Sequence, residues 1–416
     1  VNVGGGVVGT AVGGPVGKGG PAVYDQYSSP QIGFLPKEDP KSAWNLVDAQ
    51  TKNVIVAVID SGLDLTHPDG PQYIWSNEKE IPGNNIDDDK NGYIDDVNGW
   101  NFLDENNDLK DLRGHGTVVA GIIAARSNNG IGIAGINPGA IIMPIKVADK
   151  FGNTNSLNIF RAIKYAVANK AKIINISLGA KNVSALERLA INDAKAHGVL
   201  VVVASGNDGE DMSTFGPSSV GSALAVGALN YDGTRSTVSN WGGNNGLMAP
   251  GEEIYSLQSK DAPWEGPAGS KERLYTKLSG TSFSAPMVAA TASLMLVKNP
   301  KLTPYDLEDI LEASAHRLSD EDWNARTGAG LLDAAKALGS IHEKQFNVKV
   351  TGLRKLYEDK KLEAVDVYAT VSGDVDYFTV ELGKGKNAHS FKPVIGIAGQ
   401  EAHDDLVAHI KDTQLR

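Results

Sequence analysis

The 416-residue sequence predicts an α/β fold, a doubly wound and mainly parallel sheet with helices on both faces, followed by a small β-rich C-terminal unit. Between about residues 54 and 339, strand patterns alternate with helical patterns, which is typical of parallel sheets. The strands are continuous runs of Val, Ile and Leu, as expected where helices cover both faces of a sheet. After residue 339, apolar and polar residues alternate instead.

The predicted elements of the α/β region mostly alternate along the chain. In order, they are strand 54–59, helix 116–125, strand 141–147, helix 159–169, strand 173–178, helix 185–197, strands 200–204 and 224–228, and helix 284–297. Helices 116–125 and 284–297 are apolar on nearly all sides, which predicts that both run through the interior.

Three segments differ in composition. Residues 1–23 are rich in glycine and predict a flexible tail, residues 24–339 form the α/β domain, and residues 340–416 form the β-rich extension. In the extension, the apolar residues that alternate with polar ones are Val365, Val367, Ala369 and Val371. Residues 372–374 predict a turn, and we expect a helix over 401–411 to close this unit.

The composition excludes several function classes. With no cysteine, the chain can form no disulfide, thiolate metal site or cysteine nucleophile. Its 39 Lys and Arg against 50 Asp and Glu give a net charge of −11, which disfavours nucleic acid and favours hard cations as partners. No apolar run approaches the roughly 18 residues of a membrane span, and no signal peptide is apparent, so we expect no membrane partner.

Three short motifs carry residues that suit nucleophilic catalysis. Asp60 directly follows strand 54–59 in V-A-V-I-D-S-G, His115 lies in G-H-G-T at the head of one apolar helix, and Ser282 lies in G-T-S-F-S-A-P at the head of the other. Pro286 is expected within the first turn, which places Ser282 at or next to a helix N-terminus. Alone, each residue has a structural alternative: Asp60 could start a turn, His115 could be a structural histidine, and Ser282 could be a helix cap.

Together, these motifs in the chain order Asp60, His115, Ser282 resemble the subtilisin-like serine proteases (subtilase family, peptidase family S8), over roughly residues 40–340. The resemblance implies a serine endopeptidase in which Ser282 forms the acyl-enzyme, His115 is the general base and Asp60 orients it. In V-V-V-A-S-G-N, Asn207 would be the oxyanion-hole donor; the commoner family form has alanine in place of Ser205. The implied role is broad-specificity extracellular protein degradation or processing.

The resemblance also implies where an extended peptide would bind. Two segments would pair with its main chain: Gly152, Asn153 and Thr154 on one side, and Ser177, Leu178 and Gly179 on the other. The loop 208–220 would supply part of the primary specificity pocket. An apolar primary residue is favoured, with a basic one left open by the acidic residues of this loop.

Two calcium sites are predicted, both structural. The first is the front of an EF-hand-type loop, whose ligands would be Asp87, Asp89, Asn91, the carbonyl of Tyr93, and Asp95. The twelfth position is Asn98, so Asp95 or Asp96 would have to supply the bidentate carboxylate; a solvated acidic loop is the alternative. The second site is implied by the resemblance, with ligands from Asp25, Asp69, Asn129 and the carbonyls of Arg126, Ile131 and Ile133.

The remaining expectations concern context and alternatives. We expect a monomer secreted by a bacterium, made with an inhibitory prodomain that is absent from this chain. An α/β-hydrolase esterase would need G-x-S-x-G around the nucleophile and the order Ser, acid, His, and Ser282 meets neither requirement. A catalytically silent binding protein that uses the β-rich extension is the other alternative, and the intact triad disfavours it.

Overall fold

A computed structural model describes residues 41–263, 274–320 and 323–342, together with five C-terminal strands between residues 347 and 411. The predicted glycine-rich tail, Asp25 and most of the predicted turn at 372–374 lie outside the described residues.

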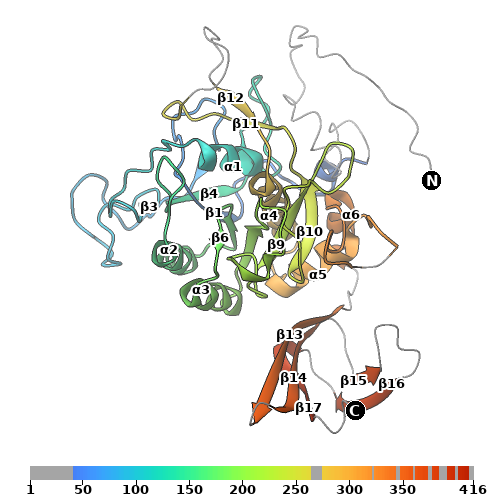
Figure 1. The fold of residues 1–416 in the computed structure, drawn as a ribbon. Coiled ribbons are helices and arrows are strands. Elements are labelled where there is room, and N and C mark those ends of the chain that lie inside the picture. Colours follow the sequence, from blue (N-terminus) through green and yellow to red (C-terminus); the bar gives the residue numbers. More distant parts are fainter. Residues whose placement is uncertain are drawn as a thin grey trace.

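The centre of the fold is an eight-stranded, wholly parallel sheet with the order β10-β9-β7-β5-β1-β4-β2, in which β3 also pairs with β4 (Figure 1). Its strands are β1 (Ile55–Asp60), β2 (Tyr73–Ile74), β3 (Trp100–Asn101), β4 (Ile141–Lys146), β5 (Ile173–Ile176), β7 (Leu200–Ala204), β9 (Leu224–Leu229) and β10 (Asn245–Pro250). The mainly parallel fold is thus confirmed. Because β1 lies between β4 and β5, its carboxyl end is the point where the strand order reverses.

Helices cover both faces of this sheet, as predicted. They are α1 (His115–Ala124), α2 (Ser156–Ala168), α3 (Ala185–Ala196), α4 (Thr281–Lys298), α5 (Pro304–Ser314) and α6 (Ala334–Gly339). Val56 and Val58 of β1 pack with α1 and α4, whereas Ala57 and Ile59 pack with α2 and α3. The predicted burial of α1 and α4 is confirmed, since nearly every residue of both helices is buried.

Shorter elements border the sheet. The antiparallel pairs are β6 (Ala180–Lys181) with β8 (Phe215–Gly216), and β11 (Ile254–Leu257) with β12 (Tyr275–Leu278); the 3-10 turns are η2 (Ala43–Leu46), η3 (Met212–Thr214) and η4 (Ser340–His342).

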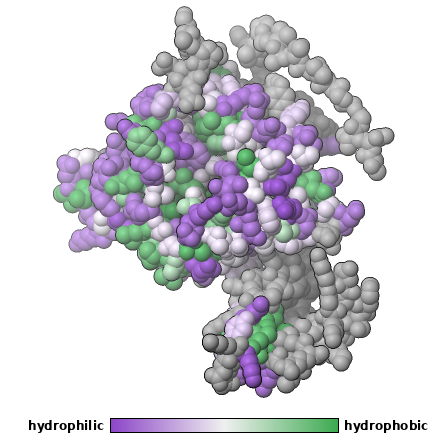
Figure 2. All heavy atoms as spheres, in the orientation of Figure 1, coloured by the Kyte–Doolittle hydropathy of each residue, from purple (hydrophilic) through white to green (hydrophobic). Residues whose placement is uncertain are grey.

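Hydrophilic residues dominate the described surface on the side of the molecule that Figure 2 shows, with apolar residues in small groups between them. None of the described helices is both long and apolar enough to cross a bilayer.

The C-terminal extension is β-rich, as predicted. Its described strands are β13 (Asn347–Glu358), β14 (Lys361–Ser372), β15 (Tyr377–Gly383), β16 (Phe391–Ala398) and β17 (Ala402–Lys411), all paired antiparallel. The helix expected over 401–411 is wrong, because β17 pairs with β14 along its length. This pairing supplies the backbone hydrogen bonds and buries Val407 and Ile410, so tertiary context overrides the local helical pattern.

A buried ion pair joins α3 to α5. Lys195 Nζ lies 2.7 Å from Glu308 Oε2, with side-chain exposures of 8% and 11%, and also lies over the Tyr305 ring. Removing only one partner would leave an uncompensated buried charge. We therefore expect Glu308→Gln to lower the free energy of unfolding by about 3 to 5 kcal/mol in denaturant titrations.

The matched control is the exposed pair of Lys181 and Glu210, whose atoms lie 2.8 Å apart at exposures of 56% and 53%. Because solvent screens such a pair, Glu210→Gln should cost at most about 1 kcal/mol. Equal effects of the two substitutions would contradict the assignment of a buried pair that contributes to stability.

Candidate active site

The three residues of the predicted triad come together at the carboxyl edge of the sheet. Asp60 is the last residue of β1, His115 is the first residue of α1, and Ser282 is the second residue of α4. His115 and Ser282 both line two adjoining cavities, of about 290 Å³ and about 900 Å³. The fold thus places an acid, an imidazole and a hydroxyl at the position where doubly wound sheets bind ligands.

Asp60 and His115 form a direct hydrogen bond. His115 Nδ1 lies 2.8 Å from Asp60 Oδ1, and the carboxylate is fully buried. If Nδ1 carries the proton and donates it to this bond, Nε2 is left as an acceptor. Burial tends to lower the pKa of His115, but the Asp60 charge and hydrogen bond outweigh it, so the pKa lies above its ordinary value of 6.5.

A second buried carboxylate, Asp111, holds the start of α1. Its oxygens accept hydrogen bonds from the backbone N–H groups of Gly114 and Thr117, and from the Ser61 hydroxyl beside Asp60. Gly114 precedes the helix with a positive φ of 87° and has no side chain to cap it. Asp111 therefore performs the capping and fixes the backbone on both sides of His115.

Ser282 is tied to the end of β5. Its hydroxyl donates to the Ser177 carbonyl at 3.1 Å rather than to His115, and the Ser177 hydroxyl donates to the Ser282 carbonyl at 2.8 Å. The expected place of Pro286 in the first turn is wrong, because α4 begins at Thr281 and Pro286 is its sixth residue. Proline has no N–H for the carbonyl four residues earlier, which is that of Ser282, so Ser177 replaces the missing donor.

The Asn207 carboxamide has a fixed orientation. Its Oδ1 accepts from the Thr281 backbone N–H at 2.9 Å and from the Thr281 hydroxyl at 3.0 Å. The Nδ2 group is thereby left as the free donor at the cavity that Asn207 shares with Ser282. The turn before it requires glycine, since Gly206 has φ 105° and an added Cβ would lie 2.2 Å from Asn240 Nδ2. Ser205 is accommodated, because its hydroxyl donates to the Asn240 carbonyl.

Most of the predicted peptide-binding residues border the smaller cavity. Its walls include Gly152, Thr154, Ser177, Leu178 and Gly179, and from the loop 208–220 Asp208, Phe215, Gly216 and Ser218. Asn153 does not line it, because its N–H and its side-chain amide both donate to Asp149.

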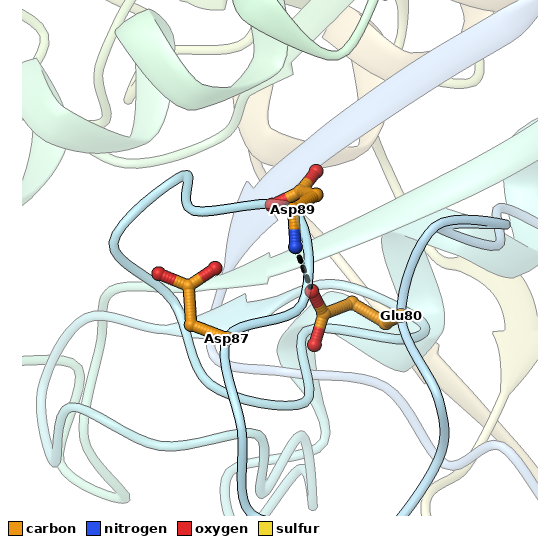
Figure 3. Close-up of side chains that lie close together, drawn as sticks. All are labelled: Glu80, Asp87 and Asp89. Carbon is orange, nitrogen blue, oxygen red and sulfur yellow. Dashed lines mark hydrogen bonds between the residues drawn. The ribbon is translucent and has the colours of Figure 1, made fainter.

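The acidic loop gathers three carboxylates, one of which the sequence pattern did not include. Oxygens of Glu80, Asp87 and Asp89 lie within 4.8 Å of one another, and Figure 3 shows the Glu80 carboxylate accepting from the Asp89 N–H. Glu80 precedes the twelve-residue pattern, so loop spacing alone could not reveal it. What distinguishes Glu80 in the structure is its burial, since only 6% of this residue is exposed.

Two other predicted ligands of this loop, Asp95 and Asp96, are engaged elsewhere. The Asp95 carboxylate accepts from the N–H groups of Gly83 and Asn85, and Asp96 accepts from the Tyr165 hydroxyl and from the side-chain amide of Asn91. The Tyr93 ring packs against Trp100, Phe102 and Tyr165. Neither Asp95 nor Asp96 therefore joins the cluster of Glu80, Asp87 and Asp89.

The second predicted cation site is a hydrogen-bonded cluster in this structure. Asp69 accepts from the Asn129 amide, the Ile133 N–H and the Tyr275 hydroxyl, while the Arg126 N–H donates to the Asp69 carbonyl. Ile131 is exposed, and its N–H donates to Asn129. The structure therefore brings Asp69, Asn129 and Ile133 together, as the predicted site requires. Burial raises the pKa of Asp69.

A parallel α/β sheet that carries an acid, an imidazole and a hydroxyl at its carboxyl edge, in the chain order Asp60, His115, Ser282, is characteristic of one class of serine endopeptidases, which are hydrolases. The model of the subtilase family matches residues 51–330. The chain therefore belongs to the subtilase family.

Individual relatives agree. The chain is 37% identical over 269 residues to the cell wall-associated protease of Bacillus subtilis (strain 168), an alignment that covers 65% of this chain and 26% of that protein. It is 34% identical over 289 residues to the subtilisin of Bacillus pumilus, covering 68% of this chain and 90% of that protein. The chain thus spans only about a quarter of the length of the first relative.

Solved structures extend the comparison. A protease of Pseudoalteromonas arctica matches with a TM-score of 0.58 and 27% identity, covering 72% of this chain and 92% of that one. A lanthipeptide protease matches with a TM-score of 0.60 and 26% identity, covering 75% and 94%.

Proposed function

We propose that this chain hydrolyses peptide bonds as a serine endopeptidase through an acyl-enzyme on Ser282. The observation that carries the proposal is the buried Asp60–His115 hydrogen bond, at a cavity that His115 shares with Ser282 and Asn207. A substrate carbonyl in this cavity would lie beside a hydroxyl, a base and an amide donor.

In the proposed mechanism, rotation about the Cα–Cβ bond moves the Ser282 hydroxyl from the Ser177 carbonyl to His115 Nε2. His115 accepts the hydroxyl proton as Ser282 Oγ attacks the carbonyl carbon, and Asp60 stabilises the imidazolium. The oxyanion would be held by Asn207 Nδ2 and the Ser282 backbone N–H at the N-terminus of α4. His115 then protonates the leaving amine, and water releases the acyl group.

Labelling with a fluorophosphonate probe tests this proposal. The folded protein should gain one adduct on Ser282, located by peptide mass spectrometry, because only an activated serine reacts at a useful rate. Unfolded protein serves as the control and should not be labelled. A folded protein without an adduct on Ser282 would favour the silent binding protein instead.

Activity should rise with pH through the titration of His115. The imidazole must be neutral to accept a proton, and Asp60 raises its pKa, so the midpoint of kcat/KM should lie above 6.5. Asp111 also raises this pKa and Arg113 lowers it, so Arg113→Ala should move the midpoint further up. A profile that is flat from pH 5 to 8 would remove His115 from the role of base.

The biological setting that we propose is secretion by a bacterium and broad-specificity degradation or processing of extended protein segments outside the cell. The support is the similarity to bacterial subtilisins. We further propose a monomeric enzyme whose precursor has an inhibitory prodomain. If so, adding the prodomain as a separate polypeptide to this chain should slow peptide hydrolysis.

We also propose that calcium binds at Glu80, Asp87 and Asp89 and stabilises the fold. An oxygen-only set of carboxylates suits this hard cation. The close approach of three negative charges is only partly compensated by backbone N–H groups and by Lys79, whose Nζ lies 3.7 Å from Asp89. A bound divalent ion would remove the remaining repulsion, so the residues fit the ion.

Chelation should therefore lower the melting temperature. A ligand at 100 times its Kd stabilises a fold by about 2.7 kcal/mol, which raises the melting temperature of a domain of about 300 residues by roughly 4 °C. We expect EGTA to cause a shift of this order, measured by calorimetry, and Glu80→Gln to abolish the response. Glu78→Gln is the matched control, since Glu78 is exposed and outside the cluster. An unchanged melting temperature in EGTA would contradict the proposal.

A further inference from the structure

The larger cavity beside Ser282 is basic, although the chain as a whole is acidic. The described residues that line it include Arg113, Lys150 and Lys277 but no aspartate or glutamate. The full sequence has a net charge of −11, so this concentration of positive charge does not reflect the overall composition. A cavity lined by one sign of charge attracts ligands of the opposite sign.

Arg113 lines both cavities together with His115 and Ser282. It lies two positions before His115, and its charge lowers the pKa of that imidazole. Its guanidinium rests on Gly152, where an added Cβ would lie 2.3 Å from Arg113 Nη1. Contact with the backbone of Gly152 limits the freedom of the arginine side chain at the rim of both cavities.

Arg113 and Lys150 have no ion-pair partner among the described residues, and neither side chain is buried. Lys150 Nζ lies 5.0 Å from the centre of the Phe151 ring. By contrast, Arg161 pairs with Glu105, Lys181 with Glu210, and Lys277 with Glu253 at 3.7 Å. The charges of Arg113 and Lys150 are therefore available to a ligand.

We propose that Arg113 and Lys150 bind an acidic side chain of the substrate in the segment that follows the scissile bond. This inference rests on the proposed peptidase function. The segments expected to pair with the peptide before the bond line the smaller cavity, so the larger one receives the leaving side. That cavity offers Arg113 as a planar donor suited to a carboxylate and Lys150 as a second charge.

The expected selectivity is moderate. Solvent-exposed ion pairs contribute about 0.2 to 1 kcal/mol each, so two cations should favour Glu over Gln by about fivefold in kcat/KM. The preference should weaken in 0.5 M salt, because salt screens exposed charges.

The test uses pairs of peptides with blocked termini that differ only in Glu or Gln at one position, scanned over three positions on each side of the cleaved bond. Mass spectrometry identifies the bond, and the Glu/Gln ratio of kcat/KM is measured for each pair. A ratio within one variant cancels any effect on Ser282 or His115. Amidated C-termini ensure that the bound carboxylate comes from a side chain.

We expect a ratio of about five at one or more positions after the bond. The double variant Arg113→Ala/Lys150→Ala should bring it near one, and Arg113→Glu/Lys150→Glu should invert it. The control Arg188→Ala/Lys172→Ala loses the same two charges, on α3 and just before β5, and should keep the wild-type ratio.

Three outcomes would overturn the inference. A ratio near one at every position would overturn it while leaving the peptidase function intact, and so would an acidic preference confined to positions before the bond. If no peptide of either series is cleaved and Ser282 takes no fluorophosphonate, the proposed function fails as well.

Discussion

Replacing Ser282 by alanine should abolish peptide hydrolysis while leaving the protein folded. The change removes the oxygen that attacks the peptide carbonyl in the proposed mechanism, and the expected loss in kcat is about 10⁶-fold, a magnitude that comes from subtilisin itself and not from this geometry. Stability should change little, because the lost interaction is one hydroxyl bond to the Ser177 carbonyl. Initial rates on casein and a melting curve measure both effects.

Ser213→Ala is the matched control for this experiment. Ser213 is an exposed serine in η3, and loss of its hydroxyl should leave the rate unchanged. If Ser282→Ala still hydrolyses casein at a comparable rate, then Ser282 is not the nucleophile and the assignment falls.

Asn207→Ala should lower kcat by about 10² to 10³ with little change in KM. Losses of this size are known for the oxyanion-hole asparagine of subtilisin, so the number is taken from that enzyme. The physical reason lies in the fixed carboxamide: Thr281 holds Oδ1, so the oriented Nδ2 would bond more strongly to an oxyanion than to a carbonyl. Steady-state kinetics on one peptide separates kcat from KM.

Asn207→Asp is a sharper companion variant. It keeps the oxygen that Thr281 contacts but puts a negative charge where the oxyanion would form, so it should be at least as slow as Asn207→Ala. A variant with raised KM and normal kcat would instead assign Asn207 to substrate binding alone.

Much of the fold could be predicted from the sequence, because parallel strands that are buried on both faces consist of unbroken runs of apolar residues. The runs ending at Asp60 and Ala204 are examples, and both became central strands. The motifs of His115 and Ser282 likewise indicate the two helix starts, but only approximately: α1 begins at His115, next to the predicted start at 116, whereas α4 begins at Thr281 instead of 284.

Other features depend on contacts between distant segments, which local patterns do not encode. Glu80 joins Asp87 through the path of a loop, and Asp111 caps α1 from outside the helix. The Arg113 guanidinium is positioned by contact with Gly152, which is 39 positions away in sequence (152 minus 113). The pairing of β17 with β14 is of the same kind, and it explains why a helical pattern there was misleading.

The reciprocal bonds between Ser177 and Ser282 join residues 105 positions apart, and Asp60 meets His115 across 55. A nascent or partly unfolded copy would hold none of these groups in reach of one another. Such copies would have no activity of their own but would be substrates for folded copies, so folded enzyme would degrade its misfolded copies.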